Sequence, residues 1–140
     1  MREQVRRKLV FHAGMVITLG MLSGIPLAMT ALGYMESQVS DWTLSHMEGL
    51  VNGLLMLAVA AAGGLLYLTP KQGAALYGCI LFTGYSNALY GWVRGVSGQA
   101  GMDFAAPISN QIAALLGGLP IVTAFIAIAL LMLGASRHSQ

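Results

Sequence analysis

Four long runs of apolar residues, separated by short polar segments, extend along the chain. The runs without a charged residue are 9–35, 49–70, 72–93 and 104–136. Each is long enough for a helix that crosses a bilayer, which takes about 20 mostly apolar residues, and none alternates like the strands of a membrane β-barrel. The pattern therefore predicts an all-α integral membrane protein, a bundle of four transmembrane helices in one domain over residues 1–140. The predicted helices are about 10–34, 44–68, 73–94 and 109–134.

The composition excludes a protein that is solvated mainly by water. Hydrophobic residues make up 56% of the 140 residues and charged residues 9%, with a mean hydropathy of +0.72. A soluble domain is about 25% charged. The chain lacks the polar groups needed to cover a water-facing surface, so a soluble enzyme, a disordered chain and a partner for nucleic acid are excluded. The single cysteine, Cys79, cannot form a disulfide within the chain.

The positive charges gather on one side of the predicted bundle. With four spans, both termini and the turn between the second and third helices lie on the same side. That side holds six of the seven basic residues, namely Arg2, Arg6, Arg7, Lys8, Lys71 and Arg137. The other side holds Arg94 with four of the five acidic residues. Because cytoplasmic segments of membrane proteins carry the excess of Lys and Arg, we expect both termini in the cytoplasm.

Pairs of small residues four positions apart recur in all four predicted helices. They are Gly20/Gly24, Gly49/Gly53, Ala60/Gly64, Gly84/Ala88, Gly91/Gly95 and Ala114/Gly118. In lipid, helices associate by close backbone packing through such residues. We expect tight packing within one bundle or between copies. A four-helix bundle has a small interior, so a large ligand would be placed between the subunits of an oligomer.

Two histidines lie within the predicted spans. His46 opens the second helix, and Gly49 and Gly53 share its helix face at three and seven residues further on. A flat porphyrin could lie on the two glycines with the imidazole as iron ligand, or the glycines could pack against another helix. His12 lies near the start of the first helix, where a snorkelling or capping role and metal ligation are both open.

Uncharged polar and charged side chains form two groups at membrane depth. Asn52 follows Glu48 by four residues, and its amide either links helices or donates a hydrogen bond to a bound oxygen. Asn87, Tyr90 and Arg94 share one face of the third helix. Arg94 could pair with an acid such as Glu48 or Asp103, or hold the carboxylate of a ligand such as a haem propionate.

Short motifs in a fixed order resemble the styrene oxide isomerase family. They are the run 7–14 (RKLVFHAG), Ser45-His46, Asn52-Gly53, Gly84-Tyr85-Ser86-Asn87, Gly101-Met102-Asp103-Phe104 and Leu119-Pro120. The resemblance covers nearly the whole chain. It implies a four-span isomerase of the bacterial inner membrane that converts styrene oxide, or a related aryl epoxide, to an aldehyde such as phenylacetaldehyde. The substrate would be a small hydrophobic epoxide that partitions into the bilayer.

The same resemblance implies a cofactor and a role for individual residues. Members of the family form homotrimers with haem b between adjacent subunits, and the axial histidine of the family falls on His46. The active-site asparagine falls on Asn52, and a family tyrosine falls near Tyr90. The remaining residues expected around the site are Asn87 as a further catalytic residue, Gly49, Gly53 and Arg94 around the haem, and Tyr85, Phe82 and Trp92 as apolar walls.

The implied reaction rearranges the epoxide and consumes no co-substrate. Ferric haem b would act as a Lewis acid on the epoxide oxygen, the benzylic C–O bond would open, and a 1,2-hydride shift would give the aldehyde. Asn52 and Tyr90 would orient or hydrogen-bond the oxygen as it gains charge.

Two other classes of function stay open on the sequence. A haem b-binding electron carrier or sensor would favour a second axial ligand, for which His12 is the other histidine within a span. A haem-free transporter or assembly protein would use Asn52, Asn87 and Tyr90 only to join helices. A haem absorption spectrum and an assay for the aldehyde distinguish the three.

Overall fold

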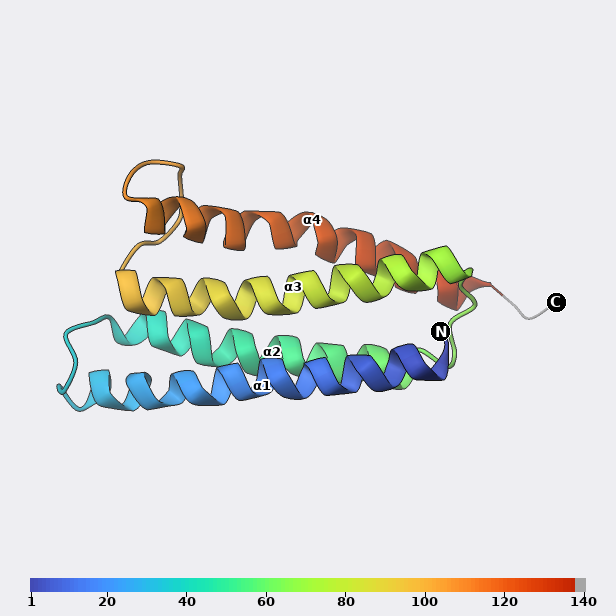
Figure 1. Ribbon diagram of the computed structural model, residues 1–140, viewed down its shortest axis with the longest axis horizontal. Helices are drawn as coiled ribbons and strands as arrows, with labels where there is room; N and C mark the ends of the chain where they lie inside the picture. Colours follow the sequence, from blue (N-terminus) through green and yellow to red (C-terminus); the bar gives the residue numbers. More distant parts are fainter. Residues whose placement is uncertain (138–140) are drawn as a thin grey trace.

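A computed structural model describes residues 1–137 as four long helices, with no strand in this range (Figure 1). The helices are α1 (Glu3–Ala31), α2 (Val39–Ala62), α3 (Pro70–Ser97) and α4 (Ile108–Ser136). The prediction of an all-α chain with four helices is confirmed. Their bounds differ from the predicted ones because hydropathy reports which residues suit lipid, whereas helix ends depend on capping and glycine.

The first two helices begin earlier and end earlier than predicted. α1 starts at Glu3, since the charged residues before the apolar run are good helix formers, and residues 32–34 leave the helix. α2 starts at Val39 rather than at 44 and stops at Ala62, where Gly63 and Gly64 follow. Residues 63–68, predicted as helix, are therefore a connection.

α3 is longer than predicted at both ends because it is capped at both ends. The Thr69 hydroxyl accepts a hydrogen bond from the main-chain N–H of Gln72, the Gln72 side chain accepts one from the main-chain N–H of Thr69, and Pro70 occupies the first turn. At the other end Gly98 takes a φ of 66°, the left-handed conformation that ends a helix after Ser97.

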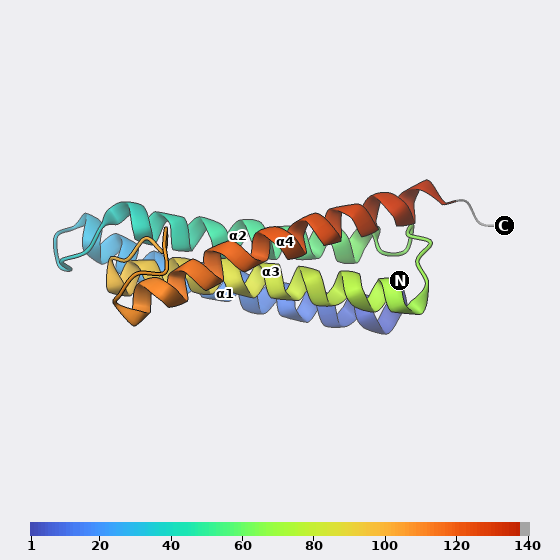
Figure 2. The same cartoon turned by 90° about the horizontal axis from the view of Figure 1, so that it is seen from above.

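The helices do not close into a bundle. α1, α2 and α3 pack against one another, and α4 packs against α3 alone. Figure 1 shows α4 along the side of α3 that faces away from α1 and α2, and Figure 2 shows α4 crossing over α3 at an angle. Large apolar side chains of α4 are exposed, among them Val122, Phe125 and Met132. Such a surface is typical of a helix that faces lipid or another copy of the chain.

Three of the four helices, α1, α2 and α4, are long and apolar enough to cross a membrane. These three are consistent with a multi-pass membrane protein. α3 has 28 residues, but its polar side chains leave no stretch of 18 residues as apolar as those of the other three helices. The fourth span therefore stays a prediction.

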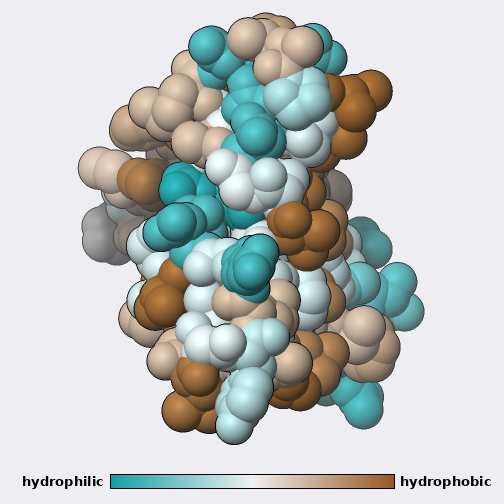
Figure 3. All heavy atoms as spheres, turned by 90° about the vertical axis from the view of Figure 1, so that its left-hand side faces the viewer, coloured by the Kyte–Doolittle hydropathy of each residue, from teal (hydrophilic) through white to brown (hydrophobic). Residues whose placement is uncertain are grey.

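The charge arrangement agrees with the order of the helices in space. The start of α1, the end of α4 and the connection between α2 and α3 lie at one end, and the other two connections lie at the opposite end (Figure 1). Figure 3 views that opposite end, where hydrophilic residues at the top, in the middle and along the lower right edge are interspersed with hydrophobic ones. The cytoplasmic location of the termini stays a prediction.

Glycines form the closest contacts between helices. A Cβ added to Gly49 would overlap the backbone of Gly20, so α1 and α2 cross backbone to backbone at this point. A Cβ added to Gly91 would overlap Ser45 between α2 and α3 in the same way. The expected close packing through small residues is confirmed at these crossings. Gly118 is exposed and has no neighbour that a Cβ would meet, so the pair Ala114/Gly118 forms no such contact in the chain.

The end of α2 is held by cationic groups from the start of the chain. The Met1 ammonium lies 2.8 Å from the Gly63 carbonyl oxygen, and Arg6 donates from Nε to the Ala60 carbonyl at 2.7 Å. The last carbonyls of a helix have no partner within it and carry the negative end of the helix dipole. Arg6 therefore caps α2 from α1.

We expect Arg6→Met to lower the free energy of unfolding by about 1.5 kcal/mol, because methionine keeps the aliphatic length and loses a charged hydrogen-bond donor. Thermal unfolding in detergent, followed by circular dichroism, measures the change. Arg7→Met is the matched control, since the exposed Arg7 side chain makes no hydrogen bond within residues 1–137. Equal losses in the two variants would show that Arg6 does not act as a cap.

Candidate functional site

His46 projects from the first turns of α2 with one ring nitrogen fixed and the other unused. Nδ1 lies 2.8 Å from the Gly20 carbonyl oxygen of α1. A carbonyl oxygen only accepts, so Nδ1 carries the proton and Nε2 presents a lone pair. Within residues 1–137 Nε2 makes no hydrogen bond, and the ring is half-buried. Histidines that bind a metal nearly always donate their other N–H to a carbonyl or carboxylate in this way.

The two glycines that follow His46 do not form an open face. The backbone of Gly20 covers Gly49, and Ile17 together with the Ala13 carbonyl covers Gly53. The interpretation that a porphyrin lies flat on Gly49 and Gly53 is therefore wrong for this chain. The alternative reading of the same spacing, a helix-packing contact, is the one that the structure contains.

His12 has a partner that makes it part of the α1–α3 contact. Its Nδ1 lies 2.9 Å from the Tyr85 hydroxyl, and its ring meets the Tyr77 and Tyr85 rings edge-on. His12 precedes Gly20 by eight residues, which is about 12 Å along the helix. Two histidines held at these positions do not converge on one iron. Over residues 1–137 no three His, Cys, Asp or Glu side chains gather to hold a metal ion.

Asn52 and Asn87 meet between α2 and α3. The Asn52 amide donates to the Glu48 carboxylate at 2.7 Å and to the Glu48 main-chain carbonyl at 2.9 Å. Asn87 donates to the Asn52 side-chain oxygen at 3.2 Å. Asn52 is buried, with 5% of its surface exposed. The two asparagines that the sequence placed in different helices therefore form one cluster with Glu48.

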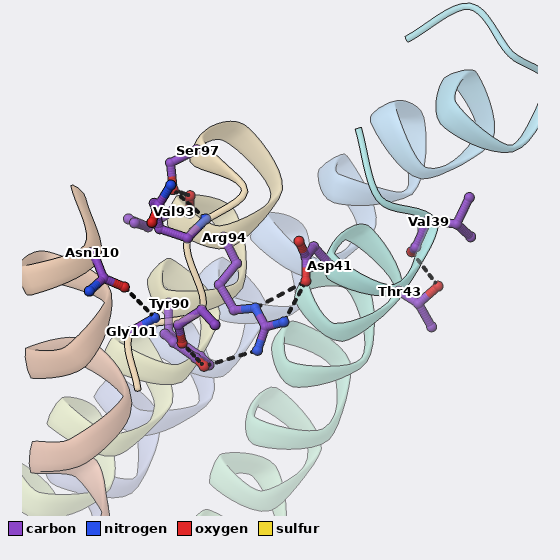
Figure 4. A network of polar contacts seen from close by, with 11 residues as sticks. Val39, Asp41, Thr43, Tyr90, Val93, Arg94, Ser97, Gly101 and Asn110 are labelled. Atoms are coloured by element: carbon purple, nitrogen blue, oxygen red, sulfur yellow. Dashed lines mark hydrogen bonds and ion pairs between the residues drawn. The ribbon is translucent and has the colours of Figure 1, made fainter. Parts of the chain in front are cut away.

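Arg94, at the end of α3, is paired with Asp41 at the start of α2 (Figure 4). Its Nη2 lies 2.6 Å from Asp41 Oδ1, its Nε donates to the same oxygen at 3.1 Å, and its Nη1 donates to the Tyr90 hydroxyl at 3.1 Å. Tyr90 donates in turn to the Ala100 carbonyl at 2.8 Å.

The expectation that Arg94 pairs with an acid is confirmed, but the acid is Asp41 rather than Glu48 or Asp103. α2 starts at Val39, and its first turn brings Asp41 opposite the last turn of α3. Three of the N–H groups of Arg94 are used inside the chain, which gives no support to a role in binding a haem carboxylate.

The connection between α3 and α4 is organised by a residue that the sequence did not single out. Asn110 accepts from the Gly101 main-chain N–H at 2.8 Å (Figure 4). It also donates to the Asp103 carboxylate at 2.8 Å. The connection folds over Tyr90, and Phe104 of the connection, Tyr90 and Ile121 of α4 border a pocket of about 350 Å³. An asparagine at the start of a helix is a common capping signal, but its partners here lie in the preceding loop.

The three predicted wall residues all come from α3. Trp92 donates from Nε1 to the Leu19 carbonyl of α1 at 3.2 Å and packs edge-on against Trp42. Tyr85 is held by His12 on the same side, and Phe82 is 42% exposed. The role of Tyr85, Phe82 and Trp92 as walls of a substrate site stays a prediction.

The predicted site residues thus fall into two groups on different sides of α2. His46 and Trp92 approach neighbouring carbonyls of α1, whereas Asn52 and Asn87 meet on the side of α3. Residues 46 and 52 are about 120° apart around a helix of 3.6 residues per turn. A ligand that contacts both groups therefore has to touch more than one face of α2.

A comparison with protein families supplies the remaining observation. The family model described as styrene oxide isomerase matches residues 5–136. No curated protein matches the chain.

Proposed function

The chain belongs to the styrene oxide isomerase family, and from this premise we propose that it isomerises styrene oxide, or a related aryl epoxide, to the aldehyde. Membership of the family implies an isomerase, and three helices suited to a bilayer agree with a membrane-bound one. The aryl epoxide, the haem b cofactor and the bacterial inner membrane as location belong to the proposal.

The observation that carries the cofactor assignment is the geometry of His46. Its Nδ1 is bound to the Gly20 carbonyl, which leaves Nε2 unengaged within residues 1–137 on a half-buried ring. Through this free nitrogen His46 would hold the haem iron as a protein ligand. Bound ferric haem b would supply a Lewis acid that polarises the epoxide oxygen.

The residues of the chain would position the substrate. The cluster of Glu48, Asn52 and Asn87 brings two amides together within otherwise apolar α2 and α3, and it offers hydrogen bonds to an oxygen that gains charge. Tyr90 has its hydroxyl engaged by Ala100 and Arg94, so its ring rather than its hydroxyl faces the pocket beside α4.

A homotrimer would bring the two groups of site residues together. His46 and the asparagine cluster lie on different sides of α2, and much of the surface of α4 is apolar and exposed. Haem between adjacent subunits would have His46 of one subunit on one side. This arrangement, and the cytoplasmic termini, follow from the family resemblance and the charge pattern.

The test uses the full chain purified in detergent without added haem. We expect a Soret band and, on addition of styrene oxide, phenylacetaldehyde detected by gas chromatography in excess of a protein-free blank. A colourless active preparation would contradict the cofactor, and a red inactive one would contradict the isomerase and favour the electron carrier or sensor. A bis-histidine carrier has no support in the geometry, since His12 and Gly20, whose carbonyl holds His46, lie eight residues apart, about 12 Å along α1.

A further inference from the structure

The carbonyl oxygen of Gly20, which holds His46, accepts a second side-chain hydrogen bond. The Ser23 hydroxyl donates to it at 2.7 Å, and His46 Nδ1 lies 2.8 Å from the same oxygen. Ser23 is fully buried, with 0% of its surface exposed. A Cβ added to Gly24 would lie 3.4 Å from His46 Nδ1, so the imidazole runs along this turn of α1. Ser23 and His46 therefore meet at one main-chain atom of α1.

The Ser23 hydrogen bond differs from the other hydroxyl bonds inside the helices. Serine and threonine in a helix commonly donate to a carbonyl three or four residues back. Over residues 1–137 six hydroxyls do so, and the Gly20 carbonyl is the one acceptor among them that a side chain of another helix also reaches. The carbonyl four residues before Ser23, that of Leu19, accepts from Trp92 of α3. Ser23 thus acts at the point where α1 supports His46.

Three donors share the Gly20 carbonyl oxygen. The third is the main-chain N–H of Gly24, which an α-helix directs to the carbonyl four residues before it. A carbonyl oxygen has two lone pairs, and every donor draws electron density from the same atom. The Ser23 hydroxyl therefore weakens the hydrogen bond that His46 Nδ1 donates, although it does not replace that bond.

The strength of the Nδ1 hydrogen bond decides how much electron density the other ring nitrogen carries. A strong acceptor pulls the Nδ1 proton away from the ring and makes Nε2 a more basic ligand. A weakened acceptor leaves Nε2 less basic, so a metal ion bound there keeps more of its positive charge. Hydrogen bonding around the axial ligand is one of the means by which a protein adjusts haem iron. A less donating imidazole suits an iron that has to attract an epoxide oxygen.

We propose that Ser23 is a positioning residue: by sharing the Gly20 carbonyl it limits electron donation from His46 to bound haem iron and so keeps that iron a strong Lewis acid. The inference rests on the proposed isomerase function. Ser23 acts through Gly20 and His46 and touches neither haem nor substrate. A Lewis acid is most effective where the oxygen gains charge in the transition state, so Ser23 affects kcat more than KM.

The first experiment measures the midpoint potential of the haem in the loaded full chain with Ser23→Ala. Without the hydroxyl the Gly20 carbonyl binds His46 more strongly, ferric iron is stabilised, and we expect the potential to fall. We expect kcat to fall about 3-fold to 10-fold, less than the loss of about 10-fold to 100-fold for a residue that bonds a metal ligand directly. Thr18→Val is the matched control, because it removes a hydroxyl bond of the same kind from an exposed position of α1 and should change neither value.

A second substitution, Ser23→Cys, separates hydrogen bonding from packing. Alanine is smaller than serine and cysteine is larger, so the two substitutions change the packing in opposite directions. Cysteine keeps a weak S–H donor, so an effect of hydrogen bonding lowers the potential in both variants, with the value for cysteine between those for serine and alanine. Shifts of opposite sign, or a wild-type potential in Ser23→Ala, would overturn the role of Ser23.

A readout that needs neither haem nor turnover tests the shared carbonyl itself. The chain has three histidines, at 12, 46 and 138, so ¹⁵N-labelled histidine gives few NMR signals from the haem-free full chain in detergent, and His46→Ala identifies those of position 46. A stronger hydrogen bond moves the Nδ1 proton downfield. Ser23→Ala should therefore shift the His46 proton downfield and leave the His12 signals in place. An unmoved His46 proton would overturn the proposal even in an active enzyme. A wild type that binds no haem would overturn the proposed function, and the proton shift would still decide whether Ser23 weakens the His46 bond.

Discussion

His46→Ala is expected to abolish haem binding and turnover together. The imidazole is held by the Gly20 carbonyl with Nε2 available, and no other histidine of residues 1–137 lies near enough to replace it. A Lewis acid contributes several kcal/mol to such a transition state, and each 1.36 kcal/mol is a factor of ten in rate. We therefore expect kcat to fall by about 1000-fold and the Soret band to be lost, as measured by absorbance and gas chromatography of the aldehyde.

His12→Ala is the control for that variant. It removes the hydrogen bond to Tyr85, which costs about 1 kcal/mol of stability, and leaves the haem ligand in place. A second variant, His46→Gly, leaves empty the space that the imidazole side chain occupied. Imidazole added to the solution can enter this space and should restore part of the Soret band. Circular dichroism establishes that the helices of each variant are formed. Retention of both haem and turnover in His46→Ala would refute the ligand assignment.

The apolar runs predicted the number of helices because each helix needs a continuous apolar surface to suit lipid. The apolar runs did not predict the helix bounds. α1 begins at Glu3 and α2 at Val39, both before the apolar run of the helix, and α2 ends before Gly63, which lies inside an apolar run. The start of α2 matters for the site. Asp41 lies outside the predicted helix 44–68 but in the first turn of α2, where it pairs with Arg94.

The candidate site was predictable within one helix and much less so between helices. The i, i+4 relation between Glu48 and Asn52 follows from helix geometry alone, and the structure contains that hydrogen bond. Which α3 residue meets Asn52 depends on the register of α2 against α3. The partner of His46 is a main-chain carbonyl, which every residue carries, so no side-chain pattern could single out Gly20. Gly20 also lies where α1 crosses α2, and a substitution at this crossing is expected to lower the stability of the protein.

Gly49→Ala is expected to separate α1 from α2. A Cβ at this position overlaps the backbone of Gly20, and neither backbone can move as a flexible side chain would. Overpacking at a close contact costs about 1–3 kcal/mol, and 1 kcal/mol lowers Tm by about 2–8 °C in domains of this size range. Thermal unfolding in detergent should therefore show a Tm lower by roughly 5–10 °C.

The same variant tests the link between helix packing and the haem ligand. Gly20 provides both the crossing with Gly49 and the carbonyl that holds His46. Any displacement of α1 lengthens the Nδ1 hydrogen bond and frees the imidazole to rotate, so Gly49→Ala should also lower haem occupancy, measured as the ratio of Soret to protein absorbance. Gly14→Ala is the matched control, because a Cβ on Gly14 meets nothing within 4 Å and alanine favours the helix. If Gly49→Ala matched Gly14→Ala in both Tm and haem occupancy, α1 and α2 would not cross at Gly20, and the support for His46 would have to come from another group.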